Sequence, residues 1–584
     1  MFSSTTKLLP YGMTDIKRII QENYYYVDKS PFISTLENTS SFVFLIRPRR
    51  FGKSLFLALL EAYYDVARKH EFDSIFGNLW IHKNQTPNRN KYLVLRLNFS
   101  TLDNRLEHIE QSFHTRLGFC FGSFADKYAA YYPANFKEQM MALPMLSDKL
   151  FFLFEETAKT ENKLYLFIDE YDNFSNTILA EYGNTTYKNL THGTGFFRNF
   201  FNVLKGGTTG VDSALERLFI TGVSPVTMDD VTSGFNIGLN ISTISTFNSI
   251  IGFTEEEVRS FFEYYKSEGL LKHEPQEMID LIKPWYDNYC FAEESIGTTT
   301  MYNSDMLLFF MAKYIPNSKP PKELIDPNVR TDYNKLRHLI RIDSTIENNA
   351  KVIQTIVNEG SIVAKLMDSF PAEDIAQYNH FISLLYYYGM LTIKGIKRGA
   401  INFAIPNHVV REQYFGYLIR TYENAYDFRL NTDTLFQLLQ GMAYDGEIEP
   451  YFAYIADCLA KQSRIREFIE GEAHVKGFLL AYMGFTSAFM MYPEYESGKG
   501  YTDFYMAPRY QAYPDMPFSF AIEVKYLKRD ENREVRLPQV INEATEQLNR
   551  YVLGEEIQAL KGPTIIRKIV VVFQGWELIA NKEV

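Results

Sequence analysis

The chain has 584 residues, more than one hydrophobic core usually serves, so we expect two to four domains. Hydrophobic residues make up 46% and charged residues 22%, which excludes a disordered chain, and the net charge of −11 excludes a protein that coats nucleic acid through bulk electrostatics. The three cysteines, Cys120, Cys290 and Cys458, are too far apart to predict a zinc ribbon or a disulfide framework.

The sequence shows no targeting or membrane segment. Its start, MFSSTTKLLPYG, has no apolar core between basic residues and a cleavage site, unlike a secretory signal. The longest uncharged apolar stretch, 478–492, is shorter than the about 20 residues that a membrane span needs. We therefore expect a soluble, cytoplasmic protein with no membrane partner.

Residues 1–248 alternate short apolar runs with longer helical patterns. The runs are SFVFLIR, YLVLRLNF, KLYLFIDE and RLFITGV. Each is rich in Val, Ile, Leu, Phe or Tyr, which is typical of strands buried on both faces of a parallel sheet. The pattern predicts an α/β domain in which helices cross between parallel strands.

The first run leads into a segment with the order of a phosphate-binding loop. In FVFLIRPRRFGKSLFLALL a strand, a short loop and a helix follow one another. Gly52 lets the backbone approach phosphate, Lys53 would reach the β and γ phosphates, and Ser54 would ligate Mg²⁺. The usual first glycine of GxxxxGK[ST] is replaced by Arg47, so this loop is bulkier and more basic.

The third run, KLYLFIDE, ends in two acidic residues, Asp169 and Glu170. Such a strand end can place Asp169 at Mg²⁺ and leave Glu170 to polarise the attacking water. Either segment alone also has a purely structural explanation, but together they predict nucleotide binding. The predicted nucleotide-binding residues are Arg49, Arg50, Phe51, Gly52, Lys53, Ser54 and Asp169. Whether ATP is hydrolysed stays open, since the sequence identifies no arginine finger.

Residues 249–425 are predicted to be mainly helical, beginning at TEEEV with Thr254 as the N-cap and acids in the first turn. Further along, HFISLLYYYGMLTIKGIKRGAINFAIPNHVVREQYF predicts a helix that stops at Gly389, two strands joined by the turn KRGA, and a helix after Pro406. A helix followed by a hairpin suggests a winged-helix-like unit. Such a unit serves either as a packing module or as a nucleic-acid contact.

Residues 426–584 predict a second α/β domain, in which FAIEVKYL and the earlier FYMA are strands. Glu523 and Lys525 are two apart on a strand and leave the same face, while Asp503 begins another strand. Asp503 and Glu523 can hold Mg²⁺ or Mn²⁺ through oxygen ligands, and Lys525 can orient or deprotonate a water. A solvated, charged strand edge is the alternative interpretation.

Three neighbouring features favour a functional site. Apolar residues before Glu523 place its charge on a buried strand, which is costly without a function. The next helix carries Gln547 and Tyr551, one turn apart on one face. Glu472, in GEAHVKGFLLAYM, lies on an amphipathic helix that can aim its carboxylate at the same site. From residue 431 onward acidic residues outnumber basic ones, so any nucleic-acid contact would be local.

The segments LPYGMTDIKRIIQENYYYVDKSPFI, LIRPRRFGKSL, LFIDEYDN and FITGVSPV resemble the bacterial AAA-ATPase-like proteins that carry a C-terminal PD-(D/E)XK nuclease domain. In that family RPRRFGKS is the usual form of the loop. The resemblance implies that residues 26–29 lie near the nucleotide. It also implies a nuclease site like that of RecB-type members. The implied residues of this site are Glu472, Asp503, Glu523 and Lys525, with Gln547 and Tyr551 nearby.

We therefore predict a multidomain α/β protein, with a P-loop AAA-ATPase-like domain at 1–248, a helical and winged-helix-like region at 249–425, and a PD-(D/E)XK restriction-endonuclease-like domain at 426–584. The predicted catalytic residues are Glu170, Asp503, Glu523 and Lys525. Ser54, Asp169, Glu472, Asp503 and Glu523 are the predicted metal ligands. The resemblance implies ATP and Mg²⁺ as cofactors, with Mn²⁺ as an option at the nuclease site, and DNA as the substrate; a homo-oligomer is one arrangement compatible with it.

Three functions follow from these expectations. The first is an ATPase and metal-dependent phosphodiesterase, in which the nucleotide state gates cleavage of DNA. The second is a nucleotide-switched protein that binds nucleic acid or a partner without cutting it. The third is a remodelling ATPase whose C-terminal domain only scaffolds assembly.

Overall fold

The computed structural model describes residues 6–103, 105–193, 195–208, 213–226, 237–329, 346–462, 464–484, 486, 488–509 and 512–584. The chain divides into two compact units. The first takes in Met1–Ser318, Asp326–Ser344 and Val363–Pro406, and the second takes in Lys319–Ile325, Thr345–Ile362 and Asn407–Val584. The predicted three-domain division, with boundaries near 248 and 425, stays a prediction. None of the described helices is both long and apolar enough to span a membrane.

The first unit is built on a parallel sheet of five strands in the order β2-β3-β4-β1-β5. The strands are β1 (Phe42–Ile46), β2 (Leu93–Asn98), β3 (Leu164–Asp169), β4 (Leu215–Gly222) and β5 (Leu239–Asn240). The four predicted apolar runs form β1 to β4, which confirms the α/β prediction. Because all five strands are parallel, their carboxyl ends lie at one edge of the sheet, where ligands bind in such folds.

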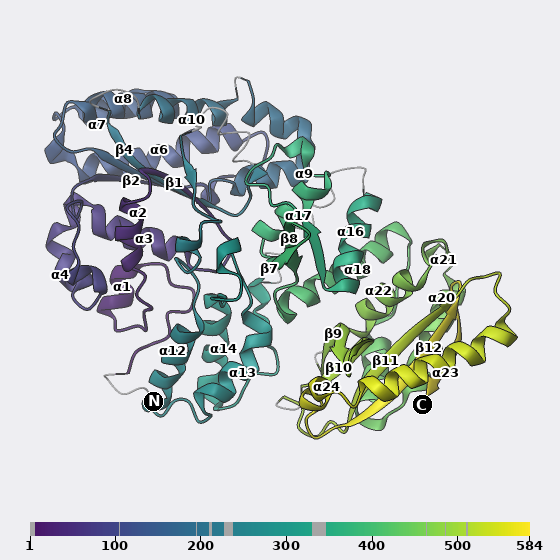
Figure 1. Cartoon of the computed structure of the whole chain (residues 1–584). Helices are drawn as coiled ribbons and strands as arrows, with labels where there is room; N and C mark the ends of the chain where they lie inside the picture. The colour runs from purple at the N-terminus through teal and green to yellow at the C-terminus, as the bar shows by residue number, and fades with distance from the viewer. Residues whose placement is uncertain are drawn as a thin grey trace. The chain divides into compact units, whose positions relative to one another are not determined.

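Helices cover both faces of this sheet (Figure 1). On one side lie α1 (Ile16–Gln21), α2 (Pro31–Glu37), α3 (Lys53–Tyr64), α4 (Phe72–Phe76) and α5 (Trp80–Lys83). The other side and the adjoining end carry α6 (Ile109–Lys127), α7 (Phe136–Ala142), α8 (Leu146–Ala158), α9 (Asn173–Thr191) and α10 (Phe196–Gly206). Two-sided cover explains why β3 is buried along its whole length.

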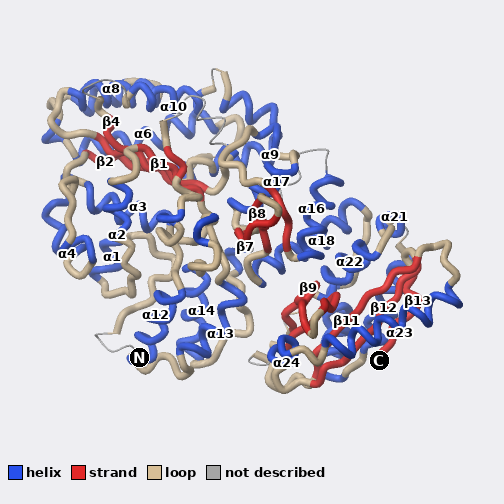
Figure 2. Tube along the Cα trace, in the orientation of Figure 1, coloured by secondary structure: helices blue, strands red, loops and turns tan. Residues whose placement is uncertain are grey.

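The remainder of the first unit is largely helical, as predicted (Figure 2). Its helices include α12 (Glu255–Ser267), α13 (Pro275–Tyr286), α14 (Ser304–Asn317) and α17 (Tyr378–Tyr387). Thr254 caps α12 in a capping box with Glu257, which confirms the predicted helix start. A small sheet has the order β6-β8-β7, with β6 at Ser361–Ala364, β7 at Thr392–Lys397 and β8 at Ala400–Ala404.

The helix, hairpin and helix predicted around Gly389 are present. α17 precedes a left-handed Gly389 with φ 77°, then β7 and β8 form an antiparallel hairpin, and α18 (His408–Ala425) follows. The hairpin turn places Arg398 and Gly399 at positive φ, a conformation that favours glycine. Whether this winged-helix-like arrangement contacts nucleic acid stays a prediction.

The second unit contains a mixed sheet in the order β13-β12-β11-β10-β9. The strands are β9 (Phe489–Ser497), β10 (Gly500–Pro508), β11 (Phe518–Leu527), β12 (Ile565–Gln574) and β13 (Glu577–Glu583). β11 and β12 are parallel and the other pairs are antiparallel. The crossover from β11 to β12 runs through α23 (Arg533–Tyr551), as parallel neighbours require.

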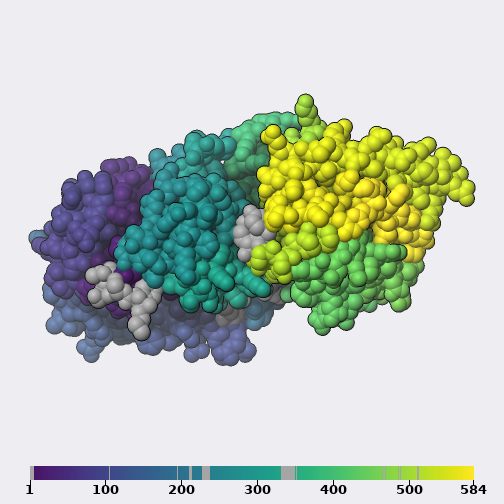
Figure 3. Space-filling view, turned by 90° about the horizontal axis from the view of Figure 1, so that it is seen from below, coloured from purple at the N-terminus to yellow at the C-terminus, as the bar shows by residue number. Residues whose placement is uncertain are grey.

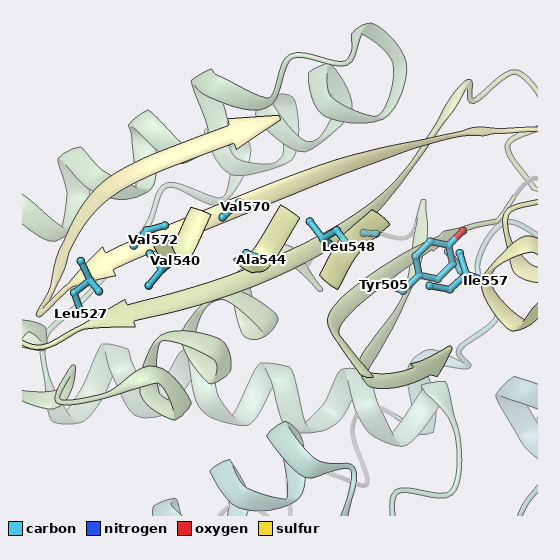
Figure 4. Packing of buried hydrophobic residues seen from close by; sticks show 10 residues of the cluster. Tyr505, Leu527, Val540, Ala544, Leu548, Ile557, Val570 and Val572 are labelled. Atoms are coloured by element: carbon cyan, nitrogen blue, oxygen red, sulfur yellow. The ribbon is translucent and has the colours of Figure 1, made fainter. Parts of the chain in front are cut away.

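α23 packs on this sheet through an apolar core (Figure 4). Its buried face carries Val540, Ala544 and Leu548, which meet Val570 and Val572 of β12. The other helices of this unit are α18, α16 (Ile346–Glu359), α19 (Thr432–Gln440), α20 (Ile448–Lys461), α21 (Ile465–Phe468), α22 (Glu472–Met483) and α24 (Glu555–Leu560). In the space-filling view the C-terminal strands and α23, in yellow, form one continuous surface (Figure 3).

Candidate active sites

The loop between β1 and α3 opens into a cavity at the carboxyl edge of the parallel sheet. The cavity measures about 390 Å³, a size typical of sites for small molecules. Its walls include the six loop residues that the sequence predicted, together with the acidic strand end. These are Arg49, Arg50, Phe51, Gly52, Lys53, Ser54 and Glu170. The structure therefore brings most of the predicted nucleotide-binding residues to one cavity.

Residues from elsewhere in the first unit complete its walls. Tyr26, Val27 and Lys29 line the cavity, as the family resemblance implied, and Phe253 and Leu308 add apolar surface. The carboxylate of Asp28, in contrast, accepts hydrogen bonds from the amides of Ser30 (2.8 Å) and Trp80 (2.6 Å) and so fixes the local chain.

Gly52 sits immediately before α3 with φ 97°, a left-handed conformation that an L side chain rarely adopts. This turn brings the first amides of α3 to the cavity, where the positive end of the helix dipole favours an anion. Arg50 also has positive φ (67°), and its guanidinium is held by Asp305 at 2.9 Å.

Arg47, which replaces the usual glycine, points into the protein and does not line the cavity. It is 1% exposed, and its guanidinium donates to the carbonyl oxygens of Ser242 and Phe247 and stacks 4.0 Å from the ring of Phe291. Burial lowers the pKa of Arg47 to about 10, so it stays charged at neutral pH. The bulk of this side chain therefore leaves the phosphate cradle open.

Lys53 lies at the first position of α3 and is nearly buried. Its ammonium donates to the main-chain carbonyls of Arg47 (2.9 Å) and Pro48 (2.8 Å). Burial lowers the pKa of Lys53 to about 8, although the carboxylates of Glu170 and Asp169 act in the opposite direction. A phosphate group entering the cavity would strengthen the charged form.

Asp169 and Glu170 are neighbours in sequence but have different surroundings. Asp169 is fully buried, accepts a hydrogen bond from the Thr221 hydroxyl at 2.8 Å, and pairs with Arg96 at 3.2 Å. Glu170 turns into the cavity with a left-handed φ of 50° and accepts from the Asn173 amide at 2.9 Å. Burial raises the pKa of Glu170, which Lys53 partly opposes.

The sequence-based analysis missed Arg96 and Asp172 at this edge. A signal for Arg96 was present, because an arginine inside the apolar run YLVLRLNF must find an acidic partner when the strand is buried. Asp172 is buried and accepts from the amides of Val223 (3.1 Å) and Ser224 (2.6 Å), so it ties the end of β4 to the end of β3.

The second candidate site lies on the mixed sheet of the second unit. Phe504 of β10 pairs with Ile522 of the antiparallel β11, so the next residues along, Asp503 and Glu523, lie opposite each other. The amide of Val524 donates to Asp503 at 2.7 Å, and the amide of Asp503 lies 3.4 Å from a Glu523 oxygen. Both carboxylates are about 95% buried.

Lys525 joins Glu523 to α23. Its ammonium lies 3.0 Å from Glu523 and donates to the side-chain oxygen of Gln547 at 2.8 Å. The structure thus brings Asp503, Glu523, Lys525 and Gln547 together. Tyr551 is buried one turn after Gln547, and its hydroxyl accepts from Arg550 at 3.2 Å.

Glu472 reaches this site through a residue that the sequence-based analysis missed. Lys476, one turn further along α22, lies 3.0 Å from Glu472, 3.2 Å from Glu494 of β9 and 2.5 Å from Asp503. A signal for Lys476 was available, because residues four apart on a helix share one face. Nothing local in the sequence pointed to Glu494, which comes from the neighbouring strand.

The charges of this site are strongly perturbed. Burial raises the pKa of Asp503, against the effect of Lys476. Burial and the nearby Asp503 charge raise the pKa of Glu523 to about 7, against the effect of Lys525. Burial alone would lower the pKa of Lys476, but Asp503, Glu472 and Glu494 outweigh it, so that pKa is raised. The pKa values of both carboxyl groups are therefore raised even though two lysines lie beside them, so the positive charge at the site does not fully balance the negative charge.

Two buried carboxylates with raised pKa values on adjacent strands are a donor set that suits a hard divalent cation. Asp503 and Glu523 therefore fit Mg²⁺ or Mn²⁺. Across the described part of the chain, however, no three His, Cys, Asp or Glu side chains are grouped so that they could hold a metal ion. Glu472 is separated from Asp503 by the ammonium of Lys476.

A phosphate loop at the edge of a parallel sheet, and a carboxylate–lysine cluster on a separate mixed sheet, define a chain that combines an ATPase-type domain with a nuclease-type domain. Comparison with protein families agrees. Residues 10–232 match the model described as predicted AAA-ATPase, and residues 470–583 match that of the PD-(D/E)XK nuclease superfamily. Residues 10–232 are thus an AAA-ATPase-like domain and residues 470–583 a PD-(D/E)XK nuclease superfamily domain, which confirms the predicted resemblance and fold class.

One curated relative is an "Uncharacterized protein in vnfD 5'region" of Azotobacter chroococcum mcd 1. It is 26% identical over 319 residues, which cover 53% of this chain and 52% of the relative. The chain therefore spans about half the length of this curated relative.

Proposed function

We propose that this protein is an ATP-regulated, metal-dependent nuclease that acts on DNA. The observation that carries the proposal is the linked cluster of Asp503, Glu523, Lys525 and Gln547 on β10, β11 and α23. Such a cluster places two metal-binding carboxylates beside an ammonium group, which are the parts that phosphodiester hydrolysis needs.

The roles within the nuclease site follow from the contacts. Asp503 and Glu523 would hold Mg²⁺ or Mn²⁺, and the ion would supply charge stabilisation at the scissile phosphate. Glu472 would become a further ligand once the ammonium of Lys476, which separates it from Asp503, moves away. Gln547 holds the ammonium of Lys525 beside Glu523. From this position Lys525 orients a water molecule or stabilises the charge that develops on the phosphate.

At the nucleotide site, Arg49 and Lys53 supply positive charge to the phosphates of ATP, and Phe51 and Gly52 shape the cradle. Ser54 and Asp169 would hold Mg²⁺, which would neutralise charge on the phosphates. Glu170 lines the same cavity, and in this proposal it polarises the attacking water molecule.

DNA as the substrate, turnover of ATP and assembly into a homo-oligomer belong to the same proposal. The acidic net charge of −11 favours local rather than extended contact with DNA. The basic residues that follow β11 would provide such an edge. They are the exposed Lys528, Arg529 and Arg533 and the half-buried Arg536.

A second function, a nucleotide-switched binding protein that does not cut, is favoured by one observation. The ammonium of Lys476 lies 2.5 Å from Asp503, at a carboxylate that a catalytic metal would use. If this pair were permanent, the domain would retain its fold without cleaving.

The test is cleavage of linear, circular and single-stranded DNA with Mg²⁺ or Mn²⁺, with and without ATP. We expect the wild type to cut, Glu523→Ala to be inactive, and Lys53→Ala to lose the response to ATP. The matched controls are Glu543→Ala on the exposed face of α23 and Lys69→Ala, both of which should behave like the wild type. ATP binding without cleavage under any condition would instead support the switch.

A further inference from the structure

Lys476 is placed among carboxylates from three different elements. Glu472 comes from α22, Glu494 from β9 and Asp503 from β10, and each has an oxygen within 3.2 Å of the lysine nitrogen. The Lys476 side chain is only 14% exposed. A buried ammonium that bridges three acids is a strong electrostatic interaction rather than a surface ion pair.

The sheet register explains why a cation is needed here. Thr502 pairs with Tyr495 and Phe504 pairs with Pro493, so Asp503 is level with Glu494 on one side and with Glu523 on the other. Carboxylates at the same level in neighbouring strands repel each other. Glu472 adds a fourth negative charge, while Lys476 and Lys525 supply two positive ones.

Both oxygens of Asp503 already have partners. One is 2.5 Å from the ammonium of Lys476, and the other accepts the amide hydrogen of Val524 at 2.7 Å. Mg²⁺ binds oxygen at about 2.0–2.1 Å and repels a neighbouring ammonium. Asp503 therefore cannot hold a divalent ion while Lys476 stays where it is.

We propose that Lys476 is a tethered cation that blocks the divalent metal at Asp503, so that metal binds when this ammonium withdraws toward Glu494. The inference rests on the proposed function, because it concerns the regulation of the same metal site. The Glu494 side chain is 36% exposed, so it offers the withdrawn ammonium a partner nearer to solvent. The affinity of this site for a divalent metal then depends on how readily the Lys476 ammonium leaves Asp503.

The experiment measures Mn²⁺ binding to the full chain without nucleotide, by electron paramagnetic resonance, and subtracts the binding that remains in Asp503→Asn. We expect Lys476→Met to bind Mn²⁺ at least about 10-fold more tightly than the wild type, because one positive charge beside the ligand is removed. Lys476→Gln, which keeps a hydrogen-bond donor for Asp503, should also bind more tightly and serves if Lys476→Met does not fold. Lys476→Arg, which keeps the charge, should resemble the wild type.

The matched control is Lys461→Met on α20. Lys461 pairs with Asp457 at 2.7 Å, also four residues away, but this pair is exposed and Asp457 is not one of the carboxylates of the site. The Mn²⁺ affinity of Lys461→Met should equal that of the wild type. Unchanged or weaker affinity in both Lys476→Met and Lys476→Gln would overturn the inference, as would the lack of any Asp503-dependent Mn²⁺ binding.

These outcomes are separable from those of the proposed function. If Lys476→Met and Lys476→Gln bind Mn²⁺ more tightly but neither they nor the wild type cleaves DNA, the tethered cation stands and the nuclease proposal fails. If the wild type cleaves DNA and neither variant has higher Mn²⁺ affinity, the nuclease proposal stands and the tethered cation fails.

Discussion

Lysines at the nucleotide site and at the nuclease site have different partners. Lys53 donates to two neutral main-chain carbonyls beside an open cavity, whereas Lys476 and Lys525 are held by carboxylates. Bonds to carboxylates are stronger than bonds to carbonyls. The first site is therefore ready for an anion, and the second must give up a cation before it accepts another.

The carboxylates show the same contrast. Glu170 faces the cavity from a strained loop position, so a ligand can reach it directly. Asp503 and Glu523 are buried on adjacent strands and bonded to their neighbours. One chain therefore builds one site around an open cavity and the other around a balance of buried charges.

The largest effect expected is on cleavage, from Lys525→Met. Removing a group that handles a proton or a developing charge lowers the cleavage rate by about 1,000-fold. Mn²⁺ binding should be retained or strengthened, because a positive charge next to Glu523 is lost. Cleavage at saturating Mn²⁺ and metal binding are measured together, with the exposed Lys582→Met as the control. Full cleavage activity in Lys525→Met would show that Lys525 takes no part in the cleavage reaction.

Arg47→Gly, which restores the usual loop glycine, tests whether the nucleotide site depends on the shape of its loop or on the charge of Arg47. Loss of the guanidinium removes hydrogen bonds to the buried carbonyls of Ser242 and Phe247 and leaves a cavity beside Phe291, so the free energy of unfolding should fall by about 4 kcal/mol. ATP affinity of the folded protein should stay within about threefold, since Arg47 does not line the cavity. Denaturant unfolding and nucleotide titration test both. A tenfold loss of ATP affinity would indicate instead that Arg47 contributes to the phosphate-binding loop.

The pH dependence of stability tests the charge balance around Glu523. Its pKa is raised to about 7 from an ordinary value near 4.5, so the fold favours the protonated carboxyl. That stabilisation is fully present below pH 4.5 and is lost as the pH rises through 7. Relative to the wild type, metal-free Glu523→Gln should be more stable at pH 8 by up to about 3 kcal/mol and no different at pH 4. Thermal unfolding with a chelator measures this, and a difference that does not vary with pH would contradict it.

Much of the architecture was predictable because it is encoded locally. Continuous apolar runs marked β1 to β4, and Gly389 and Pro406 marked the ends of α17 and the start of α18. The period of two along β11 placed Glu523 and Lys525 on one face, and the structure joins them at 3.0 Å. These features depend on neighbours in the sequence.

Arg96, Lys476 and Glu494 were missed because their roles depend on tertiary pairing. Glu494 meets Asp503 through the register of β9 against β10, and Arg96 meets Asp169 through that of β2 against β3. Arg47 stands where the loop usually has a glycine, and only the packing of Phe291 and residues 242–247 shows that its side chain turns inward. Local patterns specify the elements, while registers decide which charges meet.

The smallest expected effect comes from Arg96→Gln, which tests whether the nucleotide site also contains a competing cation. Arg96 lies 3.2 Å from Asp169 and 3.4 Å from Glu61, and is 28% exposed, so its charge is partly screened by solvent. Mg²⁺-dependent ATP binding should strengthen by about threefold. Arg96→Lys should resemble the wild type, and the exposed Arg116→Gln is the control. If Arg96→Gln instead weakens Mg²⁺–ATP binding, Arg96 positions Asp169 rather than competing for it. In that case only the nuclease site would contain a side-chain cation that must leave before the metal binds.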